Sequence, residues 1–122
     1  MPDHILIVED DLDLADVIQL ALEAHGFAAS IACNGREALD AVAIEMPSVI
    51  VLDMLMPIMN GWEFVREFDS KYGRAAAILV VTAAENARAR AAEVSADGVL
   101  AKPFETRKLI ASVKELIERH AA

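Results

Sequence analysis

The sequence predicts an α/β fold in which five strands alternate with five helices around one parallel sheet. Short apolar runs alternate five times with longer segments of helical period. Three of these runs consist only of Ile, Val and Leu, without the polar alternation of a half-exposed strand. Strands read this way when helices cover both faces of the sheet. Short connections and right-handed crossovers then favour a doubly wound (βα)5 architecture.

The strands and helices follow from local signals in chain order. Apolar runs predict strands over residues 5–8, 27–33, 49–52, 78–81 and 99–101. Asp11 is placed to cap the first helix, and Gly26 stands where a helix C-terminus favours a positive φ. Asn34 and Asn60 are each followed three residues later by Glu, close to a capping box. The fourth helix, roughly 85–94, has the weakest apolar stripe. The stripe of the first helix consists of Leu14, Val17, Ile18, Ala21 and Leu22, and that of the fifth of Leu109, Ile110, Val113, Leu116 and Ile117.

Composition limits the function classes. The 122 residues, 56% of them hydrophobic, suit one globular domain, residues 1–122. Acidic residues outnumber basic ones 20 to 11, so the net charge of −9 disfavours direct nucleic-acid binding. Cys33, the single cysteine, excludes an internal disulfide. No signal peptide or run long enough to span a bilayer is visible, which predicts a cytoplasmic protein.

Polar residues gather where the predicted strands end. Each has an ordinary explanation by itself, because an Asp after a strand is most often a turn or capping residue. In an open α/β sheet, however, the carboxyl ends of the strands form the ligand-binding edge. The residues that would meet there are Glu9, Asp10 and Asp11 after the first strand, Asp53 after the third, Thr82 after the fourth, and Lys102 and Pro103 after the fifth.

This combination predicts a particular chemistry. Carboxylates packed together repel one another, and a hard divalent cation such as Mg²⁺, or Mn²⁺ in its place, would hold them ionised. A carboxylate nucleophile, a metal, an ammonium and a hydroxyl donor are the parts that phosphoryl transfer requires.

The chain resembles the receiver domain of two-component response regulators over essentially its whole length. The resemblance implies a flavodoxin-like fold with strand order 2-1-3-4-5. It rests on five segments in order: Ile5 to Asp11, Val51 to Pro57, Asn60-Gly61, Val81-Thr82-Ala83 and Lys102-Pro103-Phe104.

The resemblance also implies a role for each matched residue. Asp53 looks like the phosphoacceptor, which takes its phosphoryl group from a sensor histidine kinase or a histidine phosphotransfer protein. Asp10 would bind Mg²⁺ directly, Glu9 would act through water, and the backbone carbonyl of Leu55 would be a third protein ligand. Thr82 and Lys102 would each contact a phosphoryl oxygen, and the bond between Lys102 and Pro103 would be cis.

In this family, phosphorylation reshapes the face formed by the fourth helix, fifth strand and fifth helix, which then changes its binding to a downstream protein or to a second copy. Many members carry an aromatic residue three positions before the lysine, where this chain has Val99. The usual coupling between threonine and aromatic residue is therefore in doubt. Ser95 stands where Gly often precedes Ala-Asp, and we expect this substitution to cost little.

Three other functions remain open. A receiver-like interaction module would bind partners without phosphorylation. An aspartyl-phosphate phosphatase would need a second carboxylate two residues after Asp53, where the chain has Leu55. A flavin- or nucleotide-binding module would need a Gly-rich loop after the first strand, where three acids stand instead. The cognate kinase, the output target, the phosphoryl lifetime and the choice between a stand-alone regulator and an excised receiver are not predicted.

Overall fold

The computed structural model describes residues 3–121. The described residues do not include Met1, Pro2 and Ala122. The predicted absence of a signal peptide and the predicted domain limits of 1 and 122 depend partly on these three residues. None of the helices between residues 3 and 121 is long and apolar enough to cross a membrane.

Five parallel strands form one sheet in the order β2-β1-β3-β4-β5, as the resemblance implied. The central strand β3 is buried along its whole length, whereas the edge strands β2 and β5 are partly exposed. This gradient explains why the inner strands are continuous Ile, Val and Leu, and the outer ones contain Ala, Ser, Gly and Lys. The strands are β1 (His4–Val8), β2 (Ala28–Ala32), β3 (Val49–Asp53), β4 (Ala77–Ala83) and β5 (Gly98–Lys102).

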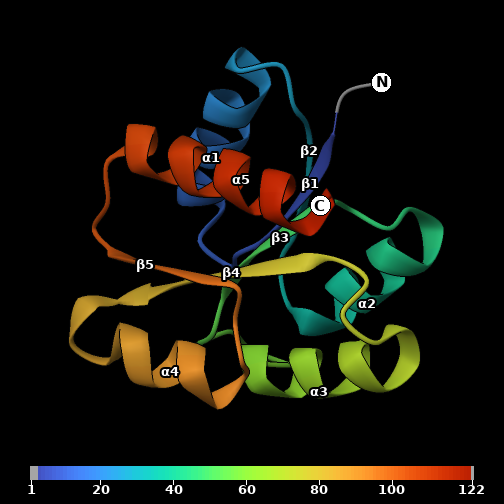
Figure 1. Cartoon of the computed structure of the whole chain (residues 1–122). Helices are drawn as coiled ribbons and strands as arrows, with labels where there is room; N and C mark the ends of the chain where they lie inside the picture. The colour runs from blue at the N-terminus through green and yellow to red at the C-terminus, as the bar shows by residue number, and fades with distance from the viewer. Residues whose placement is uncertain (1–2, 122) are drawn as a thin grey trace.

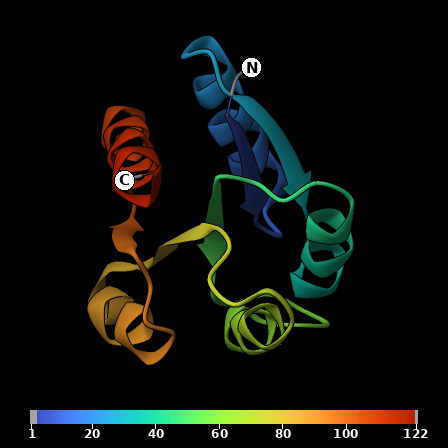
Figure 2. The ribbon, with the colours of Figure 1, turned by 45° about the vertical axis from the view of Figure 1, so that its right-hand side comes forward.

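Helices cover both faces of the sheet (Figures 1 and 2). Helices α1 (Leu12–Ala24) and α5 (Thr106–Ala121) lie on one face, and α2 (Gly35–Ile44), α3 (Gly61–Tyr72) and α4 (Ala87–Glu93) on the other. Alternate residues of each inner strand point to opposite faces, so the sheet separates two apolar cores. Ile5 and Ile7 pack in the core beneath α1 and α5, and Leu6 and Val8 in the core beneath α2, α3 and α4.

The predicted capping residues begin their helices. The Asp11 carboxylate accepts hydrogen bonds from the backbone N–H groups of Asp13 and Leu14 at the start of α1. Asn60 and Glu63 form a complete capping box at α3. At α2 the box is incomplete, because the side chain of Glu37 accepts from the N–H of Cys33 and not from that of the cap residue Asn34.

Two predicted details are wrong. The fourth helix does not reach from 85 to 94: a 3₁₀ turn occupies Ala84–Asn86, and α4 is only Ala87–Glu93. Val17 does not belong to the buried stripe of α1, because its side chain is about half exposed. The stripe that α1 buries is formed by Ala15, Ile18 and Leu22.

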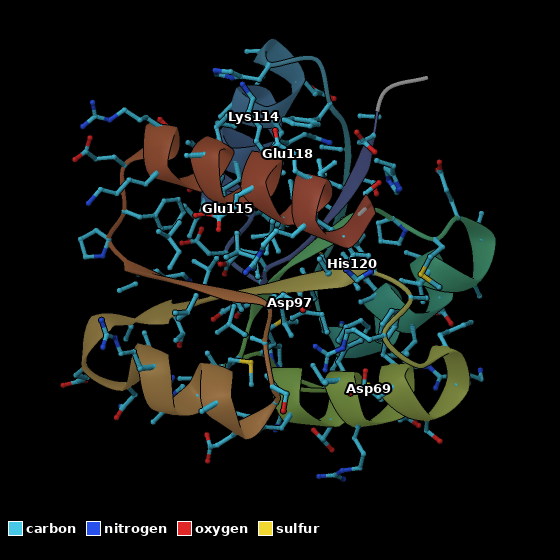
Figure 3. The ribbon with its side chains drawn as sticks, viewed as in Figure 1. Asp69, Asp97, Lys114, Glu115, Glu118 and His120 are labelled. Carbon is cyan, nitrogen blue, oxygen red and sulfur yellow. The ribbon has the colours of Figure 1, made fainter. Side chains whose placement is uncertain are left out.

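Polar contacts fasten the segment that leads into β5. The Asp97 carboxylate accepts a hydrogen bond of 2.8 Å from the backbone N–H of Ile78 in β4, and lies 3.4 Å from the guanidinium of Arg74. The same guanidinium pairs with Asp69 of α3 at 3.0 Å. Asp69 and Asp97 are labelled in Figure 3, which also shows charged residues along the outer surface of α5.

Candidate functional site

The sheet brings three carboxylates together at its carboxyl edge. Val8 of β1 and Leu52 of β3 are register partners, so the next residues, Glu9 and Asp53, leave neighbouring strands side by side. One carboxylate oxygen from each of Glu9, Asp10 and Asp53 lies within 4.8 Å of the others. Glu9 and Asp53 are buried, and Asp10 is exposed. The edge therefore carries an acidic cluster that is partly buried and partly open to solvent.

An ammonium group from the edge strand β5 completes this cluster. Lys102 ends β5, and its Nζ donates a hydrogen bond of 2.9 Å to Oε1 of Glu9. The same Nζ lies 3.7 Å from Oδ2 of Asp53. The second oxygen of Glu9 accepts from the backbone N–H of Asp11 at 3.1 Å. Both oxygens of this buried glutamate are thus engaged, which holds it in one orientation.

The environment changes the acid–base properties of Asp53. Burial, together with the negative charge of Glu9, raises the pKa of Asp53 from its ordinary value to about 6, although Lys102 and the backbone N–H of Leu55 act in the opposite sense. About nine in ten of these carboxyls are still ionised at pH 7, so the carboxylate form predominates. Burial alone would lower the pKa of Lys102, but its hydrogen bond to Glu9 and the charges of Asp53 and Glu9 raise it above its usual value.

The donor set fits a hard divalent cation. Carboxylate oxygens within reach of one another are the ligands that Mg²⁺ takes, and the exposed side of the cluster leaves room for the waters this ion retains. The raised pKa of Asp53 reflects burial of its carboxylate first and then the negative charges of Glu9 and Asp10, which a bound cation would offset. Leu55 lies two residues after Asp53, with its backbone N–H 3.5 Å from Oδ1 of Asp53. The role of its carbonyl as a metal ligand stays a prediction.

Thr82 follows Val81, the register partner of Asp53, at the same edge of the sheet. It is the second-last residue of β4 and is 1% exposed. Its hydroxyl oxygen accepts a hydrogen bond of 2.9 Å from a terminal nitrogen of Arg90, on α4. An arginine on a surface helix is most often solvated, but Arg90 is partly buried and turns back to the sheet. Nothing in the helical pattern of 85–94 indicates which arginine turns back to the sheet.

Val99 and Pro103, the other residues singled out from the sequence, belong to β5 and to the segment directly after it. Val99, in β5, is 37% exposed and is the register partner of Val80. The bond between Lys102 and Pro103 is cis, as the resemblance implied. Beside it lies an apolar groove of about 430 Å³ between α1 and the start of α5, whose lining includes Lys102. Its other lining residues are Leu14, Val17, Ile18, Ala83, Pro103, Phe104 and Thr106.

The sequence matches the family described as response regulator receiver domain over residues 5–114. Among curated proteins it is 37% identical over 121 residues to the response regulator MprA of Mycolicibacterium vanbaalenii. That alignment covers 98% of this chain and 52% of the relative, so the chain spans about half the length of this curated relative.

Solved structures give the same picture. A putative response regulator from Chloroflexus aurantiacus is 30% identical, with a TM-score of 0.89 and coverage of 97% of this chain and 99% of that one. The signal receiver domain of a signal transduction histidine kinase from Syntrophus aciditrophicus is 31% identical, with a TM-score of 0.86 and coverage of 95% and 90%.

Proposed function

Since the chain belongs to the response regulator receiver domains of two-component systems, we propose that it is a phosphoacceptor switch in which Asp53 takes the phosphoryl group. The observation that carries this proposal is the cluster at the sheet edge. A buried carboxylate that is mostly ionised at neutral pH lies beside two further carboxylates and an ammonium.

The reaction moves a phosphoryl group from nitrogen to oxygen. An oxygen of Asp53 attacks the phosphorus of a phosphohistidine, a new O–P bond forms, and the N–P bond breaks with its electron pair returning to the imidazole. Lys102, fixed by Glu9, neutralises a phosphoryl oxygen. Asp10, Asp53 and the carbonyl of Leu55 would hold Mg²⁺, with Glu9 acting through water, and the ion would supply further charge neutralisation.

The donor is a sensor histidine kinase or a histidine phosphotransfer protein. Its imidazole must reach the carboxyl edge of the sheet, so the donor protein has to cover the surface next to Asp53. The apolar groove between α1 and Phe104 adjoins Lys102 and offers nonpolar area for that contact, with Val17 half exposed beside it. The signal then leaves through the face of α4, β5 and α5 to a downstream protein or a second copy of the chain.

Enzymatic turnover of external phosphate esters is not part of this function. A phosphatase that forms an aspartyl phosphate needs a second acid two residues after its nucleophile. Leu55 occupies that position here, and its side chain is 54% exposed. The domain therefore assists only its own phosphorylation and dephosphorylation.

Intact mass spectrometry tests the proposal directly. After incubation with acetyl phosphate and Mg²⁺, the protein is expected to gain one phosphoryl group, and a chelator should prevent the gain. Asp53→Asn should remain unmodified, because an amide is not a nucleophile for phosphorus. Asp40→Asn, an exposed carboxyl of α2, is the matched control and should gain the group as the unaltered protein does.

Two results would overturn the assignment. Labelling of Asp53→Asn to the same extent would place the acceptor elsewhere. Absence of labelling in the unaltered protein, with Mg²⁺ and excess donor, would favour an interaction module that works without phosphorylation.

A further inference from the structure

The hydroxyl of Thr82 has a partner that the proposed reaction does not use. Thr82 follows Ile78 and Val80 on alternate positions of β4, so its side chain leaves the sheet on the face covered by α4. There its oxygen accepts the 2.9 Å hydrogen bond from Arg90. With Thr82 1% exposed, water cannot compete freely for this oxygen.

The chemistry of the two groups fixes the direction of this bond. A guanidinium only donates, and it stays charged at every pH of interest. A hydroxyl has one proton and two lone pairs, so the bond from Arg90 occupies a lone pair and leaves the proton of Thr82 available to another acceptor. A charged donor on the oxygen also polarises the O–H bond and strengthens the hydrogen bond that it donates.

Arg90 is in turn held by a residue of α3. Its guanidinium carbon lies 5.9 Å from the centre of the Trp62 ring, within the range of a cation–π contact. The indole N–H of Trp62 donates a hydrogen bond of 3.2 Å to Glu93, one turn further along α4. These contacts form a series from Thr82 through Arg90 to Trp62. One guanidinium therefore connects the end of β4 with the first turn of α3.

We propose that Arg90 is a positioning residue for Thr82, which aims the hydroxyl proton at the phosphoryl group on Asp53 and carries the displacement of Thr82 to Trp62. The inference rests on the proposed function, because it requires a phosphoryl group on Asp53. In this protein Val99 cannot respond to phosphorylation by rotating an aromatic ring. The proposal gives that role to the guanidinium of Arg90 and the indole of Trp62, which transmit the displacement of Thr82.

The variant that isolates Arg90 is Arg90→Met. It removes every donor while keeping an unbranched side chain with good helix propensity. Phosphorylation by acetyl phosphate with saturating Mg²⁺, followed by intact mass, is expected to slow about three- to tenfold, the loss expected for one hydrogen bond. Arg88→Met, an exposed position of the same helix, is the matched control and should keep the original rate. Arg90→Lys, which retains a charged donor, should recover part of the rate.

A double-mutant cycle separates positioning from general damage to α4. In a Thr82→Val background the hydroxyl is absent, so Arg90→Met should cause no further slowing. A merely structural role would slow both backgrounds equally, and that result would overturn the proposal.

Trp62, the single tryptophan of the chain, gives a second readout. Its fluorescence is expected to change as the unaltered protein is phosphorylated. The change should be absent from Arg90→Met after that variant has gained its phosphoryl group by mass. An Arg90→Met protein that is phosphorylated at the original rate and shows the original fluorescence change refutes the inference and leaves the proposed function standing. An unaltered protein that gains no phosphoryl group refutes the proposed function itself, and the inference with it.

Discussion

At the scale of single residues, the proposed acceptor Asp53 lies where its negative charge destabilises the fold. Its side chain is buried beside Glu9, and the single ammonium of Lys102 already makes its shorter contact with that glutamate. The raised pKa of Asp53 expresses this imbalance, because the folded state holds a proton there more tightly than the unfolded chain does. The proposed reaction requires Asp53 in its ionised form, and this ionisation opposes folding.

We expect Asp53→Asn to raise the free energy of unfolding at pH 8 by about 1–3 kcal/mol in metal-free buffer. The folded-state pKa of about 6 lies above the ordinary value, so the contribution of Asp53 to stability falls as the pH rises through the interval between them and is constant above it. Asparagine carries no charge, so its advantage should shrink toward pH 4. Urea unfolding at several pH values measures this, and an equal advantage at pH 5 and pH 8 would contradict the electrostatic explanation.

The sequence predicts the acidic residues of this cluster better than the residue that contacts Thr82. Glu9, Asp10, Asp53 and Lys102 could be grouped because the carboxyl ends of parallel strands meet at one edge. Arg90 could not, because its long side chain reaches from a helix back to β4, and helical periodicity does not specify such a contact.

Ser95 gives a second case in which the sequence was not sufficient. The sequence predicted a small cost for serine at this position, but its φ of 51° lies in the left-handed region that suits glycine. Such a backbone costs an L-residue about 1–2 kcal/mol. The sequence shows that serine replaces the usual glycine at this position. It does not show the positive φ that makes the replacement unfavourable.

At the scale of elements, the connection from β3 to α3 packs closely against the residues at the end of β3. The backbone N–H of Gly61 donates a hydrogen bond of 2.9 Å to the carbonyl of Met54, the residue after Asp53. A Cβ at Gly61 would lie 2.8 Å from the Cα of Met54 and 2.6 Å from its sulfur. Only glycine allows the start of α3 to approach the residue after β3 this closely.

Gly61→Ala is therefore expected to destabilise the protein by about 1–3 kcal/mol and to slow phosphorylation of Asp53. The added methyl group meets backbone as well as side chain, so the strand end has to move. Urea unfolding and the mass assay with acetyl phosphate measure the two effects. Gly26→Ala serves as the comparison: its φ of 88° makes alanine unfavourable, but no atom lies within 4 Å of the new Cβ, so stability should fall and the phosphorylation rate should not. Unchanged stability and rate in Gly61→Ala would show that the loop adapts at no cost.

The helices differ in how well local signals predict them. Capping residues and apolar stripes predict the positions of α1, α2, α3 and α5 in the sequence. The buried faces of these helices carry large side chains. The short α4 buries chiefly Ala87 and Ala91, so its stripe is weak and its limits were wrong. A 3₁₀ turn such as Ala84–Asn86 leaves no periodic pattern in the sequence from which it could be predicted.

At the scale of the whole molecule, acidic charge is concentrated where a cation would bind. The chain carries a net charge of −9, and three of its carboxylates meet at one sheet edge. A cation that binds this edge in the folded state alone stabilises the fold by mass action. Metal affinity and thermal stability should therefore change together.

We expect Mg²⁺ at ten times its dissociation constant to raise the melting temperature by about 4–7 °C, the shift that about 1.4 kcal/mol produces in a domain of this size. Thermal unfolding with Mg²⁺, and with NaCl at equal ionic strength, separates binding from general screening of the negative charge. Asp10→Asn should reduce the effect. A rise of the same size in NaCl would mean that the edge does not bind Mg²⁺ selectively.

The alternation of strands and helices, and hence the layered fold, could be predicted from the apolar runs and helical stripes alone. The strand order could not, because periodicity states that β1 and β3 are strands but not that they are neighbours. That information came with the resemblance of five short segments to a known family, and the sheet confirms it.

The hydrogen bond between Thr82 and Arg90 joins the interior of the sheet to a helix that other proteins can touch. Free-energy coupling through such a link is mutual. If phosphorylation alters how strongly a protein binds α4, then that protein, once bound, alters the stability of the phosphorylated state by the same factor. A target protein that binds Arg90 would therefore both respond to phosphorylation and influence it. The concentration of that target in the cell would help to determine what fraction of this domain carries a phosphoryl group.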